Sequence, residues 1–431
     1  MIGLALPVLA TVPPVLRAIR VEPVTAIRTG YLAASGGGLA PLARRLPHAG
    51  SSVAQMPLRN LLRTPRRTLL TAFGIGAAIT AMVGVIGMLD SFRATIDRTE
   101  RELTRTVPDR VTIQLDRFHA LGSRELAAVT GSDTLRAAQP GLQLAARVTS
   151  GGADVDAVVD LLDLEHGLWT PTISAGARTG GIVLSEKAAR DLGVRPGDMV
   201  ELRHPRREGS LAFRMVISRV RVAGLQPNPL RFTAYMDLRE AGRFGLAGLA
   251  NVVQARPAVG VDEAQVRRGL FGQPSVRSVQ PVTAVTRSFS DTLDQFTDIL
   301  RIAELMVLML ALLIAFNSTS ISADERRREH ATMFAFGLPV RRVLAMATVE
   351  AMLTGLVGTA AGITAGYAVL RWITGSLLPR TLPDIGVLPD LAGGTVLTAL
   401  AIGSVAVSVA VLLTAPKLRR MDVPATLRVV E

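Results

Sequence analysis

Side chains that could carry chemistry gather in one charged stretch, residues 317–350, between two long apolar runs of the sequence. Its polar members include Glu325, Arg326, Arg328 and Glu329, and its apolar members include Met333, Phe334, Phe336 and Leu338. Such side chains can form ion pairs on one side of a helix and apolar contacts on the other. Gly337 suits the end of that helix, and Pro339 cannot continue it. The stretch predicts a short amphipathic helix, although its arginines alone would also suit an ordinary basic loop.

Two carboxylates lie within apolar runs, where an ionised side chain is costly and usually faces protein or water. Glu350 lies about 10 Å into the run that follows the charged stretch, at a rise of about 1.5 Å per residue. It could pair with the nearby arginines or extend back to the headgroup region, and the sequence leaves both open. Glu304 lies beside Arg301 at the end of another run, which favours a local pair at the interface.

Motifs for catalysis and cofactor binding are absent from the sequence. It contains no G-x-x-x-x-G-K-[ST] loop for a nucleotide, no G-x-S-x-G and no H-E-x-x-H. The chain has no cysteine and five scattered histidines, so neither a thiolate site nor a zinc site is expected. We expect no catalytic, metal or cofactor site, and any ATP chemistry would belong to a partner protein.

The composition indicates a membrane protein. Of 431 residues, 49% are hydrophobic, and the mean hydropathy is +0.36, which is rare for a soluble chain of this size. The net charge of +13 comes mostly from arginines that flank apolar runs, and only 4% of residues are aromatic. Lipid headgroups therefore explain the charge better than nucleic acid does.

Four apolar runs are long enough to cross a bilayer, which takes about 20 helical residues. They cover residues 68–90, 299–317, 343–372 and 391–414, and residues 1–12 resemble part of a further span. The other segments are a linker with an amphipathic helix (13–67), a long insertion (91–298), the charged connection (318–342), a short loop (373–390) and a tail (415–431). The pattern predicts a four-helix transmembrane bundle that carries one inserted domain.

The insertion has the patterning of a water-soluble α/β domain. Short alternating runs at residues 110–115, 181–184, 199–203 and 213–222 predict strands. Ser185 and Gly193 bracket a short helix, as its N-cap and its terminating glycine. About 200 residues is ample for a core of its own.

Arginines predict the orientation in the membrane. Residues 13–67 contain nine arginines and one acid, residues 318–342 contain five arginines, and the tail after 415 is basic. The 376–390 loop has only Arg380. Because short basic segments stay in the cytoplasm, we expect both termini and the charged stretch on the cytoplasmic side of the cell membrane. The inserted domain is then expected on the outer side.

The charged stretch also resembles a known family. The pattern E-R-x-x-E, then A-x-G, two basic residues and a Glu in the next span is present as Glu325, Arg326, Glu329, Ala335, Gly337, Arg341, Arg342 and Glu350. It looks like the FtsX/MacB-type permease domain of ABC transporters, whose coupling helix docks on a separate ATP-binding subunit. Residues 182–202 are similar to the extracytoplasmic core domain of MacB-type permeases. Phe336 departs from the family, which usually has a small or aliphatic residue there.

The resemblance implies a permease subunit driven by a dimer of partner ATPases. ATP would close the dimer and push the coupling helices, and the spans would relay that motion to the outer domain. A lipoprotein, lipid or amphiphilic peptide would then be moved or released outside the membrane. The alternative is a signalling scaffold that regulates a cell-wall hydrolase without transport. A lipid-sized groove in the outer domain would favour transport, and a flat patch would favour signalling.

An internal repeat suggests that the chain is half of a larger arrangement. Residues 14–30 and 415–431 share P-x-L-R, a second arginine and a later proline followed by arginine. In the resembled family this motif ends each four-span half, so we expect a missing first half or a second permease copy as partner. Gly358, Gly362 and Gly366 form a stripe at which another helix could approach closely, and two halves would normally pack through such stripes.

Reporter fusions test the predicted orientation. A reporter that is active only outside the cytoplasm should give a signal when fused near Gly209 and none when fused near Ala323, because the arginine-rich connection stays inside. The reverse pattern would overturn the orientation of every span.

Overall fold

The computed structural model describes residues 12, 61, 65–208, 212–325 and 327–419. Almost all of the predicted partial span at 1–12 and of the linker at 13–67, most of the tail at 415–431 and the repeat at 14–30 lie outside the described residues. Contacts divide the chain into two compact units, which are described separately. Unit 1 comprises residues 1–72, 315–357 and 407–431, and unit 2 comprises residues 73–314 and 358–406.

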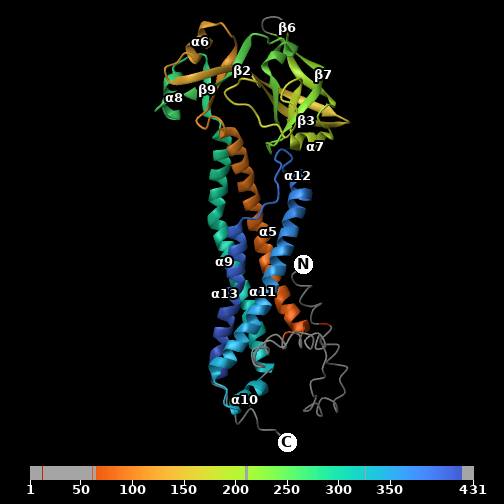
Figure 1. The fold of residues 1–431 in the computed structure, drawn as a ribbon, viewed down its shortest axis with the longest axis vertical. Helices are drawn as coiled ribbons and strands as arrows, with labels where there is room; N and C mark the ends of the chain where they lie inside the picture. Colours follow the sequence, from red (N-terminus) through yellow and green to blue (C-terminus); the bar gives the residue numbers. More distant parts are fainter. Residues whose placement is uncertain (1–11, 13–60, 62–64, 209–211, 326, 420–431) are drawn as a thin grey trace. The chain divides into compact units, whose positions relative to one another are not determined.

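Among the described residues, four helices have the length and composition needed to cross a membrane: α5 (Pro65–Thr104), α9 (Ala284–Glu325), α11 (Val340–Trp372) and α13 (Gly393–Arg419) (Figure 1). Helices α5 and α9 continue well beyond the apolar runs at 68–90 and 299–317. The reason is local, because residues 91–107 and 284–300 contain neither glycine nor proline to end a helix. The third span continues through a π-helix, η3 (Ile373–Leu377), and α12 (Leu378–Thr381), so the outer loop begins at Leu382.

Glycines allow the helices of unit 2 to approach closely. A Cβ atom on Gly362 would lie 2.7 Å from the carbonyl oxygen of Gly76, and one on Gly366 would lie 2.7 Å from Cβ of Val83. The Thr80 hydroxyl donates to the carbonyl of Gly362 at 3.2 Å. The glycine stripe of α11 is therefore occupied by α5 of the same chain and is not left open for a second half.

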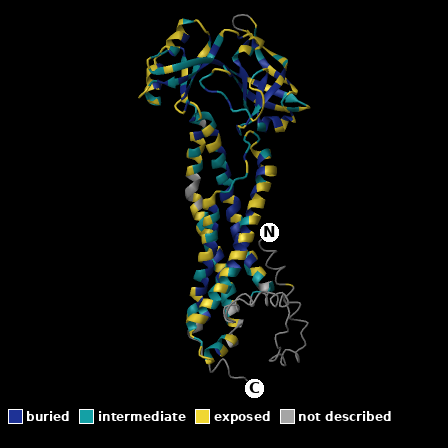
Figure 2. Ribbon diagram, viewed as in Figure 1, coloured by how far each residue is buried: buried dark blue, intermediate teal, exposed yellow. Residues whose placement is uncertain are grey.

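The larger lobe of the inserted domain is a closed β-barrel. Its strands are β2 (Leu135–Ser150), β3 (Ala153–Leu162), β5 (Ile182–Ser185), β6 (Met199–Glu208), β7 (Ala212–Gln226) and β8 (Thr233–Asp237). They pair in the circular order β2–β3–β8–β5–β7–β6 and back to β2, and β4 (Ala175–Gly176) adds to β7. Alternate residues face inward, so the barrel interior is filled with buried aliphatic side chains (Figure 2).

A smaller lobe shares strand β2 with the barrel. The first half of β2 pairs with β9 (Leu249–Pro257), which pairs with β1 (Val111–Ala120), which pairs with β10 (Val276–Pro281). Helices α6 (Arg124–Thr130) and α8 (Glu263–Phe271) contribute the buried Leu126, Val129, Val266 and Leu270 to its core. The two lobes are joined by the continuous backbone of β2.

The helix N-cap predicted at Ser185 and the helix end predicted at Gly193 are confirmed. The Ser185 hydroxyl accepts from the backbone N–H of Ala188 at 3.1 Å, and Gly193 ends α7 (Glu186–Leu192) with φ of 67°. Strands β6 and β7 contain the stretches predicted at 199–203 and 213–222, and β1 and β5 begin one residue after the predicted starts at 110 and 181. A 3₁₀ helix, η2 (Leu238–Phe244), follows β8 and is capped by Asp237.

Substitution of Gly362 tests the close approach of α5 and α11. Gly362→Ala should lower the thermal midpoint in nanodiscs, because overpacking costs about 1–3 kcal/mol. The matched control is Gly375→Ala, since a Cβ there meets nothing within 4 Å. Equal midpoints for the two variants would show that the glycine contact is not tight.

Candidate functional site

The charged connection forms a short helix between two spans in unit 1. Helix α9 ends at Glu325, α10 covers Arg327–Ala335, and α11 begins at Val340. Gly337 has φ of 83°, the left-handed region that favours glycine. The N–H of Leu338 donates to the carbonyl of Met333 at 3.1 Å, which closes the helix end. The predicted helix break at Gly337 is confirmed.

The side chains of this connection have different exposures. Ala331 is fully buried, Met333 and Phe334 are half-buried, and Glu329 is exposed. Phe336 lies just beyond the end of α10 and is 81% exposed. Arg326 lies outside the described residues, and for Glu325 and Arg328 the structure describes only the backbone. The surface available to a partner therefore includes a large aromatic side chain at the turn.

Glu350 lies in α11, three turns after its start, and is half-buried. Its backbone carbonyl accepts from the Thr354 hydroxyl at 3.0 Å. The ion pair expected between the Glu350 side chain and the arginines beside α10 stays a prediction. Within the described residues, no cluster of three or more His, Asp or Glu side chains is placed to hold a metal ion.

Helices α5 and α9 meet the inserted domain at Arg110, the residue before β1. Its backbone N–H donates to Val107, three residues after the end of α5, and its carbonyl accepts from Val282, just before α9. Arg110 is 3% exposed, and its guanidinium lies 4.5 Å from the centre of the Trp169 ring. It donates to the Gln254 side chain at 3.0 Å and to the carbonyl of Leu103 at 3.3 Å. One buried side chain thus contacts the end of α5, strand β9 and the loop after β3.

The loop around Trp169 holds the end of α5 from the other side. The indole N–H donates to the carbonyl of Glu102 at 3.0 Å. The Glu102 carboxylate accepts from the backbone N–H and the hydroxyl of Thr172, each at 2.8 Å. The Arg105 guanidinium donates to the carbonyl of Thr170 at 3.1 Å. We call Arg110, Glu102 and Trp169, with their partners, the stalk joint.

Burial shapes the electrostatics of the stalk joint. It lowers the pKa of Arg110 to about 10 and raises the pKa of the Asp160 carboxyl to about 6. The same burial raises the pKa of Tyr235, which pairs with Asp160 across β3 and β8. The side chain of Gln143 donates to Asp160 at 2.9 Å and partly offsets the burial effect.

Sequence analysis did not single out the stalk joint. Its members come from positions up to about 150 residues apart, and no local pattern links Arg110 to Gln254. The available signal was composition, because Trp169 is one of only two tryptophans in the chain. A rare aromatic residue in a loop of a soluble domain often marks a packed contact.

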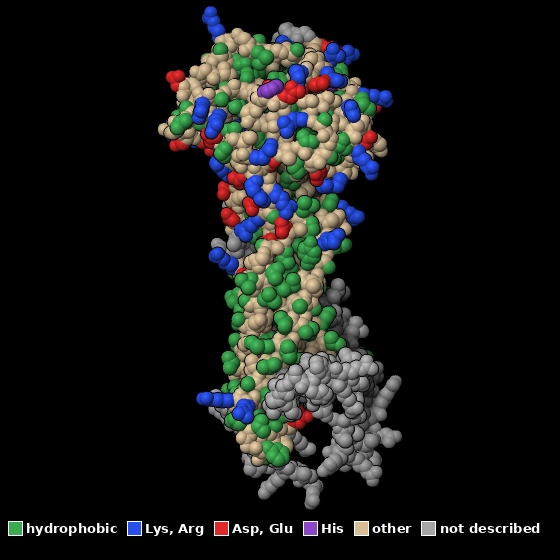
Figure 3. All heavy atoms as spheres, in the orientation of Figure 1, with side chains coloured by type: hydrophobic (Ala, Val, Ile, Leu, Met, Phe, Trp, Pro, Cys, Tyr) green, Lys and Arg blue, Asp and Glu red, His purple; other side chains and the backbone are tan. Residues whose placement is uncertain are grey.

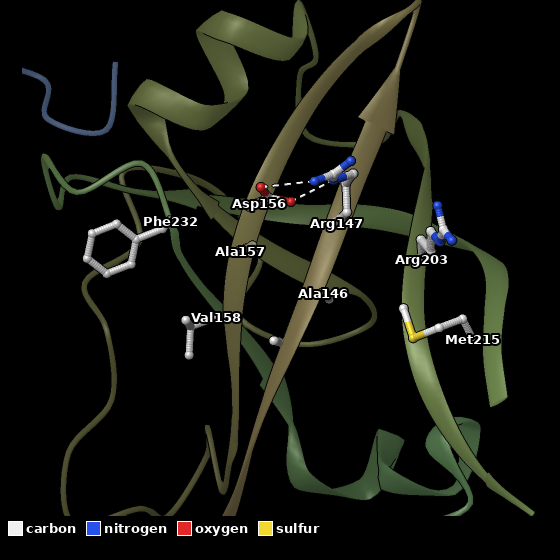
Figure 4. Close-up of a pocket in the computed structure, with 9 residues that line it drawn as sticks. Ala146, Arg147, Asp156, Ala157, Val158, Arg203, Met215 and Phe232 are labelled. Carbon is white, nitrogen blue, oxygen red and sulfur yellow. Dashed lines mark hydrogen bonds and ion pairs between the residues drawn. The ribbon is translucent and has the colours of Figure 1, made fainter. Parts of the chain in front are cut away.

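An open hollow of about 430 Å³ lies on the outside of the barrel (Figure 4). Ala145 is among its lining residues, and Phe232 and Met215 lie at opposite sides. Arg147 and Asp156 form a bidentate pair at 2.6 and 3.1 Å along one wall. The volume falls in the lower range of small-molecule pockets, and the walls mix charged and apolar side chains. The hollow therefore does not decide between transport and signalling.

Charged side chains are concentrated on the inserted domain and the adjoining ends of its helices, whereas hydrophobic side chains dominate the visible helical surface beyond them (Figure 3). The membrane-facing side chains of α9 include the exposed Ile302, Leu305, Met306, Met309 and Leu313. This distribution fits helices surrounded by lipid and a domain surrounded by water.

Two domain families match the chain. The family described as "FtsX-like permease C-terminal" matches residues 302–423. The family described as "MacB-like periplasmic core domain" matches residues 68–270. Together they cover all four apolar helices and most of the inserted domain. No curated protein matches the chain significantly.

Solved structures give weaker similarities. The periplasmic region of MacB from Actinobacillus actinomycetemcomitans has 10% identity and a TM-score of 0.29, over 43% of this chain and 92% of that chain. The extracellular domain of the noncanonic ABC-type transporter YknZ from Gram-positive bacteria has 12% identity and a TM-score of 0.27, over 40% of this chain and 99% of that chain. Scores this low carry no weight beside the two domain matches.

Titration of Asp160 should make the outer domain less stable as pH rises. Burial raises the folded pKa of this carboxyl to about 6, well above its usual value, so the folded state binds the proton more tightly. The free energy of unfolding should fall by on the order of 2 kcal/mol between pH 4 and pH 6 and stay low above that. Asp160→Asn should remove this slope and keep the bond from Gln143.

Urea unfolding in detergent can measure this effect. With Trp372→Phe as background, the fluorescence of Trp169 reports the stalk joint alone. Asp156→Asn is the matched control on the same strand, because hydrogen bonding to Arg147 lowers the pKa of Asp156. The assignment fails if Asp160→Asn keeps the same dependence on pH as the unaltered protein.

Proposed function

Because the chain belongs to the FtsX/MacB-like family of ABC transporter permeases, we propose that it couples ATP hydrolysis by a partner ATPase dimer to the movement of a substrate outside the membrane. The chain itself supplies no nucleotide site, so hydrolysis takes place on the partner. Its motion reaches the outer domain mechanically, through helices, and the substrate is not threaded through a channel.

The length of α5 and α9 is the observation that carries this proposal. At about 1.5 Å per residue, a helix of 40 residues and one of 42 residues extend about 60 Å, roughly twice the hydrocarbon thickness. Each runs without a break from the apolar segment to the inserted domain, where both meet at the stalk joint. An unbroken helix is stiff, so displacement of one end moves the other.

Helix α10 supports the position of the ATPase contact. It lies between two spans and exposes Glu329, and the turn that follows it exposes Phe336. An exposed phenylalanine beside charged residues suits an interface with a protein, since aromatic side chains contribute strongly to binding. The partner is an ABC ATP-binding subunit, docked on the cytoplasmic side of the cell membrane, where both chain termini also lie.

The proposed substrate class rests on the family alone and names no single compound. A lipoprotein, lipid or amphiphilic peptide is released on the outer side, next to the inserted domain. The hollow of about 430 Å³ on the barrel is too small to select among them. The signalling-scaffold alternative has no separate support among the described residues.

Variants of the coupling helix test the ATPase contact. Phe336→Asp, Phe334→Asp and charge reversal at Arg328 or Glu329 should abolish co-purification with the ATPase and leave membrane insertion intact. The expected loss is more than tenfold in complex yield, because removing an aromatic anchor costs about 2 kcal/mol or more.

The matched control is Val259→Asp on the outer domain. Val259 is 86% exposed and Phe336 is 81% exposed, so both changes place a carboxylate on the surface. Val259→Asp should leave the complex unchanged. If the variants of the coupling stretch also leave it unchanged, the ATPase docks elsewhere.

A further inference from the structure

The outer loop between α12 and α13 is bound to the barrel lobe by backbone hydrogen bonds. The N–H of Arg231 donates to the carbonyl of Asp384, and the N–H of Gly386 donates to the carbonyl of Pro229, each at 2.8 Å. Between them, Leu230 and Ile385 form an isolated antiparallel bridge. Two segments more than 150 residues apart thus pair in one register, which an unstructured loop would not do.

Ion pairs reinforce the same contact. The Arg231 guanidinium lies 2.9 Å from Asp384 and 3.6 Å from Asp191 of α7. Lys187 lies 2.6 Å from Asp191, and its side chain packs against Gly386, where an added Cβ would lie 3.3 Å away. Arg231 and Lys187 are only 20% and 10% exposed, so solvent screens these pairs less than it screens surface pairs.

The other end of the loop is bound to α5. The Ser91 hydroxyl donates to the carbonyl of Asp390 at 3.0 Å, and the Asp390 carboxylate pairs with Arg98 at 2.7 Å. Asp90 accepts from the backbone N–H of Ala392 at 3.1 Å and from the Thr395 hydroxyl at 2.6 Å. Residues 382–392 are therefore held at both ends.

We propose that residues 382–392 form a strap that ties α11 and α13 to the barrel lobe, with Arg231 and Asp384 as its positioning residues. This role rests on the proposed function, because it gives motion of α11 a route to the barrel. The route is separate from the stalk joint, where α5 and α9 meet the inserted domain. Of the two lobes, it is the barrel that the strap contacts through Leu230 and Arg231, so displacement of the strap moves the barrel relative to the smaller lobe.

The backbone register of the strap can be tested in the whole chain without any partner. The natural sequence contains no cysteine, so an introduced pair has no competing thiol. Leu230→Cys with Ile385→Cys should form a disulfide in nanodiscs under mild oxidation, because bridged residues have suitable geometry. The control is Leu230→Cys with Leu388→Cys, on the same loop but at an exposed position. Equal disulfide yields for both pairs would overturn the docked strap.

The mechanical role can be tested with spin labels at Arg219→Cys on the barrel and Val259→Cys on the smaller lobe. With the co-purified ATPase, a non-hydrolysable ATP analogue should shift the distance between the labels. Asp384→Ala should abolish the shift while complex yield and ATPase rate stay unchanged, and Asp384→Glu should restore it. An unchanged shift in Asp384→Ala would overturn the strap and leave the proposed function standing. If the protein with an intact strap shows no shift, the proposed function fails, even where the disulfide confirms docking.

Discussion

Backbone N–H and C=O groups inside hydrocarbon have no water to bind, so each membrane segment must satisfy them within its own helix. Much of this molecule depends on that constraint. It makes the four spans continuous helices, and a continuous helix is also a stiff connector. Because helices in lipid gain little from the hydrophobic effect, close backbone approach at Gly362 and Gly366 holds α5 against α11. The same features that satisfy the membrane thus prepare the chain to transmit motion.

The stalk joint converts that stiffness into a defined attachment. A buried arginine is costly to desolvate, and Arg110 offsets this through a ring contact with Trp169 and hydrogen bonds to Gln254 and Leu103. Hydrogen bonds and ring contacts are directional, so the end of α5 can adopt few orientations relative to the lobes. Apolar packing alone would have allowed sliding. In the proposed mechanism, such directional contacts would keep displacement from being lost between helix and domain.

Sequence patterns predicted what short-range chemistry determines. The caps at Ser185 and Gly193, the break at Gly337 and the four apolar spans each depend on neighbouring residues. The apolar runs at 68–90 and 299–317 predict the segments within lipid but not the ends of α5 and α9, because apolar content marks the lipid and not the helix. The partner of the glycine stripe, the closure of the barrel and the stalk joint depend on contacts between residues far apart in the sequence. Periodicity carries no information about these contacts.

Strand β2 belongs to two hydrophobic cores at once. Its pairing passes from β9 to β3 between Gly141 and Leu142, where a Cβ on Gly141 would lie 3.0 Å from the carbonyl oxygen of Leu161. A slip of one residue in β2 would turn its side chains outward in both lobes together. Neither lobe can therefore change its register along β2 without changing that of the other. Disorder in one lobe removes half of the pairing of β2, so the shared strand couples the stability of the two lobes.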